Sequence, residues 1–182
     1  MPLVVLLGGA RSGKSSLTMR LASACGTPVT FVATAEARDT EMVDRIARHR
    51  AERPADWDVI EEPLDLLAGL DKPPDGDCVI VDCLTLWVSN LIEQGLADDE
   101  VRERAVEAAD AARSRSGRTI VVGNEVGSGV VPMNELARRY RDLLGSVNAA
   151  WAARAHHSAL LVAGRVVGLT DPARFIEEVD RG

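Results

Sequence analysis

The chain of 182 residues has few aromatic residues, little basic charge and few cysteines. Phe, Trp and Tyr make up only 3% of it, so we expect a core built mainly from Val, Leu, Ile and Ala. The formal net charge of −7 argues against a nucleic-acid partner, because polyanion binding normally needs a basic face. Cys25, Cys78 and Cys83 lack a metal-type C-x2-C spacing, which favours buried free thiols and a cytoplasmic location.

Long apolar runs are absent as well. No stretch reaches the roughly 18 apolar residues that cross a membrane, so we expect no membrane span. Hydrophobic residues make up 46% of the chain and charged residues 27%, an ordinary balance for a globular protein. The length suits one domain, which we predict to cover residues 1–182.

Short apolar runs alternate with segments of helical spacing. Runs rich in Val, Ile and Leu predict strands buried on both faces at residues 3–7, 28–32, 78–81, 118–122 and 159–163. Helices are expected at residues 16–25, 40–52, 98–114 and 134–155, with a short helix and a frayed end within 171–182. The alternation predicts a doubly wound, mostly parallel α/β sheet with helices on both faces. Residues 166–169 predict a C-terminal edge hairpin with Gly164 at the first turn position.

A phosphate-binding motif follows the first apolar run. Its pattern is G-x-x-x-x-G-K-[ST], and its residues are Gly8, Gly9, Ala10, Arg11, Ser12, Gly13, Lys14 and Ser15. Such glycines let backbone N–H groups point at phosphate oxygens, the lysine neutralises the β/γ-phosphates, and the serine offers its hydroxyl to Mg²⁺. Lys14 and Lys72 are the only lysines of the chain, so a lysine would rarely occur at this position of the motif by chance. The alternative is an ordinary Gly-rich turn; we predict a P-loop NTPase-type nucleotide-binding catalytic domain.

Asp82 is the candidate for the metal-side carboxylate. It directly follows the apolar run at residues 78–81, and P-loop enzymes hold Mg²⁺ with a carboxylate at the end of an inner strand. The alternative is an aspartate that caps the next helix, which Thr85 and Leu86 could begin.

His49 is the only histidine among the first 155 residues. It lies three residues after Ile46 and seven after Met42, so a helix would place all three on one inward face. A neutral imidazole can act as a nucleophile or base, but a core histidine fits the same position. Four arginines crowd these turns and suit phosphate binding, although a solvated basic face explains them too: Arg45, Arg48, Arg50 and Arg53.

A glycine-rich segment, residues 123–132, follows the fourth apolar run. Its three glycines, Gly123, Gly127 and Gly129, predict a loop at the active edge where backbone approaches a ligand closely. An ordinary flexible connection is the alternative. Two further groups are assigned no function, namely Arg138, Arg139 and Arg141 on an expected solvated helix face and the pair His156 and His157.

Six motifs stand in one order along the chain. They are the loop at residues 8–15, Val32-Ala33-Thr34-Ala35, His49-Arg50 followed by Arg53-Pro54, Trp57 with Glu61-Glu62-Pro63, Val81-Asp82-Cys83-Leu84-Thr85, and Asn124-Glu125-Val126-Gly127 with Val130-Val131-Pro132. Together they resemble the bifunctional adenosylcobinamide kinase/adenosylcobinamide-phosphate guanylyltransferase family. The resemblance covers about the whole chain and is specific, whereas the phosphate loop alone occurs in many enzymes.

The resemblance implies roles for particular residues. His49 would become covalently guanylylated, and nucleotide would contact the loop at residues 8–15 together with Thr34, Ala35, Glu36, Arg50, Ala51, Glu52, Arg53, a glutamate after Trp57, and Asp82. Glu61 and Glu62 are adjacent, and we choose Glu61 for that contact. A second histidine that some members carry just before the key one is Arg48 here.

The resemblance also implies two reactions. The terminal phosphoryl group of ATP or GTP passes to the aminopropanol hydroxyl of adenosylcobinamide, with Lys14, Ser15, Asp82 and Mg²⁺ supplying charge neutralisation. GMP then passes from GTP to the new phosphate through His49. The expected partners are therefore nucleotides and a corrinoid, and the family is associated with a symmetric trimer.

Two other functions fit parts of the sequence. One is a small-molecule kinase of the same fold, in which His49 only packs. The other is a regulatory GTP switch, which is disfavoured because no N-K-x-D motif is present and the D-x-x-G match at residues 142–145 lies inside a predicted helix.

Overall fold

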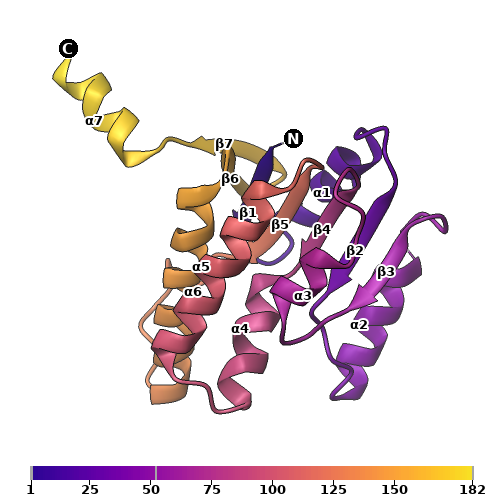
Figure 1. Ribbon diagram of the computed structural model, residues 1–182. Helices are drawn as coiled ribbons and strands as arrows, with labels where there is room; N and C mark the ends of the chain where they lie inside the picture. The colour runs from indigo at the N-terminus through magenta and orange to yellow at the C-terminus, as the bar shows by residue number, and fades with distance from the viewer. Residues whose placement is uncertain (1, 52, 182) are drawn as a thin grey trace.

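The computed structural model describes residues 2–51 and 53–181 and contains one seven-stranded sheet. The strand order is β3-β2-β4-β5-β1-β6-β7, with β7 antiparallel to β6 and the other neighbours parallel. The strands are β1 (Leu3–Gly8), β2 (Val29–Ala33), β3 (Asp58–Glu61), β4 (Cys78–Asp82), β5 (Thr119–Asn124), β6 (His157–Val162) and β7 (Arg165–Leu169). Figure 1 shows them between α2 at one side and α5 and α6 at the other.

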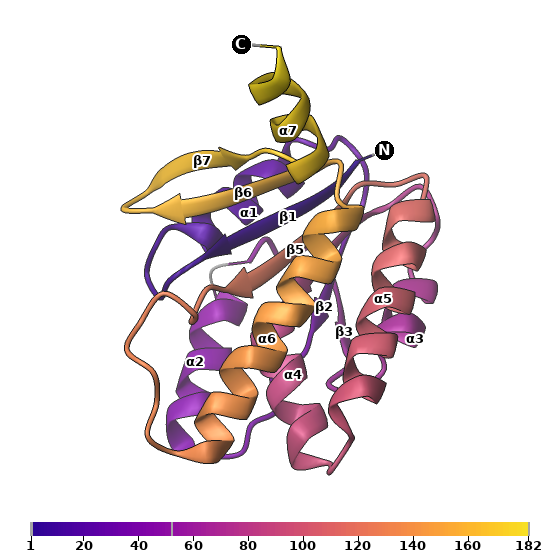
Figure 2. The same ribbon diagram turned by 90° about the vertical axis from the view of Figure 1, so that its left-hand side faces the viewer.

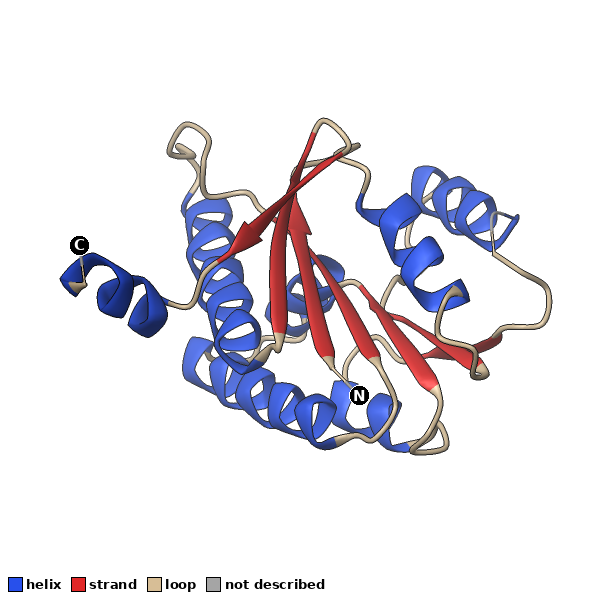
Figure 3. Ribbon diagram, turned by 90° about the horizontal axis from the view of Figure 1, so that it is seen from above, coloured by secondary structure: helices blue, strands red, loops and turns tan. Residues whose placement is uncertain are grey.

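Helices lie on both faces of the sheet (Figure 3), as the sequence predicts. They are α1 (Lys14–Ser23), α2 (Thr40–Ala51), α3 (Leu66–Asp71), α4 (Leu84–Glu93), α5 (Asp98–Ser114), α6 (Glu135–Arg154) and α7 (Pro172–Asp180). Within residues 2–51 and 53–181, no helix combines the length and the apolar character that a membrane crossing needs. The predicted α/β class is therefore confirmed, and α5 has the bounds expected from the sequence.

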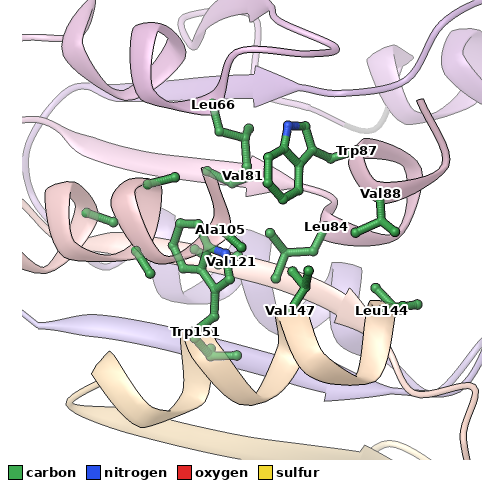
Figure 4. Close-up of a cluster of buried hydrophobic side chains, with 14 of the residues drawn as sticks. Leu66, Val81, Leu84, Trp87, Val88, Ala105, Val121, Leu144, Val147 and Trp151 are labelled. Carbon is green, nitrogen blue, oxygen red and sulfur yellow. The ribbon is translucent and has the colours of Figure 1, made fainter. Parts of the chain in front are cut away.

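The main core fills the space between the sheet and α3 to α6. Trp87 and Trp151 are its largest fully buried side chains. Figure 4 shows side chains from these four helices meeting over Val81 of β4 and Val121 of β5. A smaller cluster on the other face includes Ala22 of α1. Burying an aliphatic or aromatic side chain contributes about 1.5–3 kcal/mol, so the central strands are held rigidly.

The C-terminal hairpin is present, but its turn differs from the prediction. Ala163 and Gly164 form the turn with φ of 50° and 72°, and Val162 pairs with Arg165. Two positive φ values are typical of a two-residue turn of type I′, in which glycine suits the second position as well as the first. The sequence pattern misplaced the turn by one residue because it assigned Ala163, which is not a typical left-handed residue, to the strand.

Candidate active site

The phosphate loop joins β1 to α1 and is accessible at its tip, where Gly9, Ala10 and Arg11 are exposed. Gly13 precedes the helix with a φ of 103°, which favours glycine. The Lys14 ammonium lies inside the loop and donates to the carbonyl oxygens of Gly8 and Gly9 at 2.7 Å each. These contacts hold a cation where phosphate groups would bind at the helix N-terminus.

Neighbouring elements hold the phosphate loop in shape. A Cβ atom on Gly8 would lie 2.5 Å from the Leu161 carbonyl oxygen, so only glycine fits there. The hairpin turn contributes the Gly164 N–H, which donates to the Ser12 carbonyl at 2.9 Å, and the Glu125 N–H donates to the Gly8 carbonyl at 3.1 Å. The loop is thus pre-formed by contacts from β6, the hairpin and the end of β5.

Asp82 is the last residue of β4 and does not cap the next helix, because the N-cap of α4 is Cys83. Strand β5 lies between β4 and β1, so Asp82 is not on the strand next to the phosphate loop. Its side chain nevertheless lines the same crevice of about 20 Å³ as Ser15, the second residue of α1. Thr18 also lines this crevice, and its Oγ1 is buried without a hydrogen-bond partner.

Ser15 and Asp82 fit a magnesium ion by the chemistry of their donors. A serine hydroxyl and a carboxylate offer the oxygen ligands that Mg²⁺ takes, with nucleotide phosphates and water completing its shell. Among the described residues no group of three or more His, Cys, Asp or Glu side chains could hold a metal by itself. Ser15 and Asp82 would therefore leave most ligand positions of the ion to phosphate oxygens and water.

His49 lies in the last turn of α2 on the face that the sequence predicts. Met42, Ile46 and His49 all line one cavity, and the His49 side chain is 30% exposed. Its Nδ1 lies 3.8 Å from Oδ2 of Asp82. The imidazole thus lies between the large cavity and the crevice beside Ser15, accessible to a ligand from either side.

The arginines near His49 separate into different environments. Arg53 stacks on the Phe31 ring, with 3.6 Å between its guanidinium carbon and the ring centroid. Arg50 pairs with Glu61 at 2.6 Å, and Arg48 is exposed. The side chain of Arg45 and the whole of Glu52, a predicted nucleotide contact, lie outside the described part of the chain.

Arg53 is a partly buried cation with unused donors. Its Nε and Nη1 atoms are buried and have no hydrogen-bond partner among residues 2–51 and 53–181. Burial lowers the pKa of its guanidinium, and the nearby Asp82 carboxylate opposes that shift. Arg53 lines the crevice together with His49, Asp82 and Ser15, so its free N–H groups are available to an anion bound there.

The large cavity has a volume of about 960 Å³ and lies between α2 and the sheet. Apolar walls come from residues that include Phe31, Ile46 and Leu86, and the predicted contacts Ala35 and Glu36 line it as well. Arg38, which the sequence analysis missed, also lines it and pairs with Glu36 and Glu93. Arg38 lies two residues after the predicted contact Glu36, in the segment between β2 and α2, where no motif includes it.

The adjacent residues Glu61 and Glu62 have different environments in the structure. Glu61 lines the cavity beside Arg50, whereas Glu62 pairs with Lys72 at 3.1 Å and accepts the Asp65 N–H at 3.1 Å. Of the two, Glu61 is therefore the one available to a ligand in the cavity. Its choice as a nucleotide contact stays a prediction.

Thr34, a predicted nucleotide contact, is held by several internal hydrogen bonds. It is fully buried, and its hydroxyl donates to the Cys83 carbonyl at 2.8 Å and accepts the Cys83 N–H at 2.7 Å. Its own carbonyl accepts from Asn90 at 2.8 Å, and its N–H donates to the Asp82 carbonyl. Thr34 thus positions the end of β4, and its contact with nucleotide stays a prediction. The sequence analysis missed Asn90, a buried polar residue in an apolar helix.

Outside the cavity, three expectations need correction. Gly123 lies within β5, where a Cβ atom would come 2.6 Å from Asn148 Oδ1, so close packing requires this glycine and not a ligand. Cys25 is only partly buried, although it is free. The three arginines in the first two turns of α6 are partly buried and make structural contacts: Arg138 with the Met133 carbonyl, Arg139 with Asp98 and Arg141 with Asp142.

The family is evident from comparison with known proteins. A family model described as cobinamide kinase / cobinamide phosphate guanyltransferase matches residues 4–169. The bifunctional adenosylcobalamin biosynthesis protein CobP of Pseudomonas aeruginosa is 48% identical over 163 residues, which cover 88% of this chain and 92% of that protein. The CobU proteins of Salmonella typhimurium and Escherichia coli are 37% and 36% identical over 176 residues, covering 89% of this chain and 96% of each relative.

A solved structure supports the fold alone. A prototypical ATPase from the type III secretion system of pathogenic bacteria aligns with a TM-score of 0.54 at 10% identity, covering 98% of this chain and 61% of that chain. The family match extends from the phosphate loop to the end of β7, so it includes every motif described above. The chain therefore belongs to the cobinamide kinase / cobinamide phosphate guanyltransferase family of bifunctional enzymes in cobalamin biosynthesis.

Proposed function

We propose that the chain phosphorylates adenosylcobinamide at its phosphate loop and then transfers GMP through a covalent intermediate on His49. The observation that carries this proposal is one crevice lined by Ser15, His49, Arg53 and Asp82, which come from three separate elements and the segment after α2. A histidine that merely packed in the core would not need an adjacent carboxylate and an arginine with two buried donors that have no partner in the described part of the chain.

The first reaction uses the phosphate loop. Backbone N–H groups of residues 8–15 would bind the β- and γ-phosphates of ATP or GTP, and Lys14 would turn from the Gly8 and Gly9 carbonyls toward them. The aminopropanol oxygen of the substrate attacks the γ-phosphorus, the bond to the β-phosphate oxygen breaks, and the hydroxyl proton is released. Positioning and charge neutralisation supply most of the catalysis in such transfers.

Ser15 and Asp82 are the residues that would hold Mg²⁺. The ion, when bound, would neutralise charge on the phosphate oxygens during transfer.

The second reaction proceeds by two displacements at the same phosphorus atom. With Nδ1 facing Asp82, His49 would present Nε2 to the α-phosphorus of GTP. A nitrogen–phosphorus bond forms and the bond from the α-phosphorus to the bridging oxygen breaks, so pyrophosphate leaves. An oxygen of the cobinamide phosphate then attacks the same phosphorus, and His49 leaves with its electron pair, giving adenosylcobinamide-GDP. Arg53 would stabilise the charge on the α-phosphate oxygens.

Labelling with GTP that carries isotope at its α-phosphorus tests the intermediate. The protein should retain label that is lost in acid and stable in base, as expected for a phosphorus–nitrogen bond. His49→Ala should abolish the label and guanylyl transfer while much of the kinase activity remains, because phosphoryl transfer needs no covalent histidine.

His157→Ala is the matched control, since His157 is exposed and should label like the wild type. A folded His49→Ala protein that still formed the adduct would show that His49 is not the nucleophile. Loss of both activities together with lowered stability would instead indicate that His49 is structural.

We propose that the chain forms a homotrimer through its C-terminal region. Helix α7 has no buried residue, and its apolar side chains Phe175, Ile176 and Val179 are each about 60% exposed. Figure 1 shows α7 standing away from the sheet, and β7 leaves an open sheet edge beside it. Exposed apolar surface of this kind marks an interface. Light scattering should give three chain masses for the wild type and one for Phe175→Asp; a monomeric wild type would contradict the proposal.

Two further expectations concern the chain as a whole. We propose that residues 1–182 act as a single catalytic domain, which is supported by one continuous sheet from β3 to β7. We also propose a cytoplasmic location. It is supported by the cysteine content, because the three cysteines form neither an even framework nor a metal-type spacing, which is typical of proteins in a reducing compartment.

A further inference from the structure

The segment after β5 displays apolar side chains to solvent. Val130 is 95% exposed, Met133 98% and Val131 61%. We call residues 126–134 the apolar loop; it contains no charged residue, although 27% of the chain is charged. Isolated exposed apolar residues are ordinary, but several on one short segment mark a binding surface.

The backbone of the apolar loop is held in place at both ends. The Gly127 N–H donates to Glu125 Oε1 at 2.5 Å, and Asn134 caps α6 by accepting the Ala137 N–H at 3.2 Å. Arg138 donates to the Met133 carbonyl at 2.6 Å. Polar contacts thus fix the loop, and its apolar side chains take no part in holding it.

The apolar loop begins at the phosphate loop and extends past the sheet. The Glu125 N–H donates to the Gly8 carbonyl, and Figure 2 shows the loop leaving the end of β5 and running down to the start of α6. Asn148 of α6 donates to the carbonyl of Asn124, the last residue of β5. Because α6 starts at Glu135, its first part extends about 20 Å past that point at 1.5 Å per residue. The apolar loop therefore runs from the carboxyl edge of the sheet to the start of α6 beyond that edge.

We propose that the apolar loop binds the corrin macrocycle of the substrate, an inference that rests on the proposed kinase function. The group that accepts phosphate is at the end of a flexible aminopropanol arm, whereas the bulk of a cobinamide is a ring edged by methyl and amide groups. When the arm reaches phosphates bound at residues 8–15, the ring must lie beyond the carboxyl edge, separated from Gly8 by the length of the arm. The apolar loop starts beside Gly8 and continues beyond that edge to α6, so it offers an uncharged surface suited to a macrocycle without ionised side groups.

Other surfaces fit the macrocycle less well. The large cavity is lined by His49, Arg50, Arg53, Glu61 and Asp82, charged or titratable groups suited to a nucleotide. The apolar face of α7 lies at the opposite end of the molecule from α2 and α4 (Figure 1), far from the phosphate loop tip. It suits a second copy of the chain better than the substrate.

The test is the double variant Val130→Ser/Met133→Ser, whose side chains are exposed and contribute little to folding. Equilibrium dialysis with cobinamide, detected by its visible absorbance, should show binding about tenfold weaker, equivalent to about 1.4 kcal/mol. The KM for cobinamide should rise by a similar factor with little change in kcat, as expected when uniform binding is lost. Labelling by GTP without corrinoid should not change.

Leu67→Ser on α3 is the matched control, because Leu67 is an exposed apolar residue remote from the phosphate loop. Unchanged cobinamide binding in the double variant overturns the proposal. A fall in oligomer mass also overturns it, since the loop would then lie between copies of the chain. If the wild type binds cobinamide at the apolar loop but does not phosphorylate it, only the proposed kinase function fails.

Discussion

Replacing Arg53 by Ala should slow guanylylation of His49 by about 10²- to 10³-fold, or about 2.7–4 kcal/mol of transition-state stabilisation. The reason is that Nε and Nη1 of Arg53 are buried in the crevice that His49 and Asp82 line, without a partner among the residues that the structure describes. Donors already fixed beside a reacting phosphate need no reorganisation when charge develops, so their removal acts mainly on the rate.

The same change should have a small effect on folding. Loss of the contact with Phe31 costs about 0.5–2 kcal/mol, the range for a cation over an aromatic ring. Removing a cation whose pKa burial lowers also relieves an unfavourable desolvation, which opposes that cost. Arg53→Lys keeps the charge but loses the planar donor fork and the stacking, so we expect it to recover little of the rate.

The rate of guanylylation is measured as single-turnover labelling of the protein by GTP that carries isotope at its α-phosphorus. Thermal unfolding of the same variants checks that they are stably folded. Arg48→Ala is the matched control, because Arg48 is an exposed arginine in the same turn as His49. If Arg53→Ala became labelled as fast as Arg48→Ala, the unused donors of Arg53 would have no role at the phosphate and the reasoning would be refuted.

Three further predictions concern charge and base selection. Lys14→Ala should abolish cobinamide phosphorylation, whereas Lys72→Ala should not, because it removes only the surface ion pair with Glu62. Wild-type turnover in Lys14→Ala would show that the phosphate loop is not the kinase site. Guanylyl transfer should use GTP far better than ATP while the kinase step accepts either, and equal AMP and GMP transfer rates would contradict this. Desolvation by burial, and then the nearby Arg113, lowers the pKa of His156 in the folded protein below 6.5. The unfolded state therefore binds more protons than the folded state as the pH drops below 6.5, so the free energy of unfolding should fall in that range. Thermal unfolding measured at several pH values should show a weaker fall in His156→Ala and an unchanged fall in His157→Ala. In the wild type, Nδ1 of His156 accepts the Leu3 N–H, and His156→Ala removes this acceptor.

The central strands could be predicted because they are continuous apolar runs, whereas β3 and α3 could not. Two of the four residues of β3 are acidic, and this edge strand is mostly exposed, so it lacks any apolar run. Helix α3 has only six residues, too few to show a period. Helix α4 differs from both, because its buried apolar residues recur at helical spacing and the sequence therefore did contain a signal for it: Leu84, Trp87, Val88, Leu91 and Ile92.

The site divides in the same way between local and long-range information. The phosphate loop could be predicted because its chemistry is contained in eight consecutive residues. The approach of His49 to Asp82 depends on how α2 lies against β4, two elements about 30 residues apart in sequence, and no local pattern contains it. The different environments of Glu61 and Glu62 likewise depend on a long-range contact, the pairing of Glu62 with Lys72.

Asp82 links the two proposed reactions physically. It lies beside Ser15, where it would help to hold the metal for phosphoryl transfer, and 3.8 Å from His49, where it would orient the imidazole for guanylyl transfer. One carboxylate cannot serve two triphosphates at once, so the two reactions should take turns at this crevice. The order then follows from the chemistry, because the phosphate made in the first reaction is the nucleophile of the second. A single domain with one crevice is sufficient for both steps if the corrinoid stays bound nearby, and the apolar loop beside Gly8 would provide that attachment.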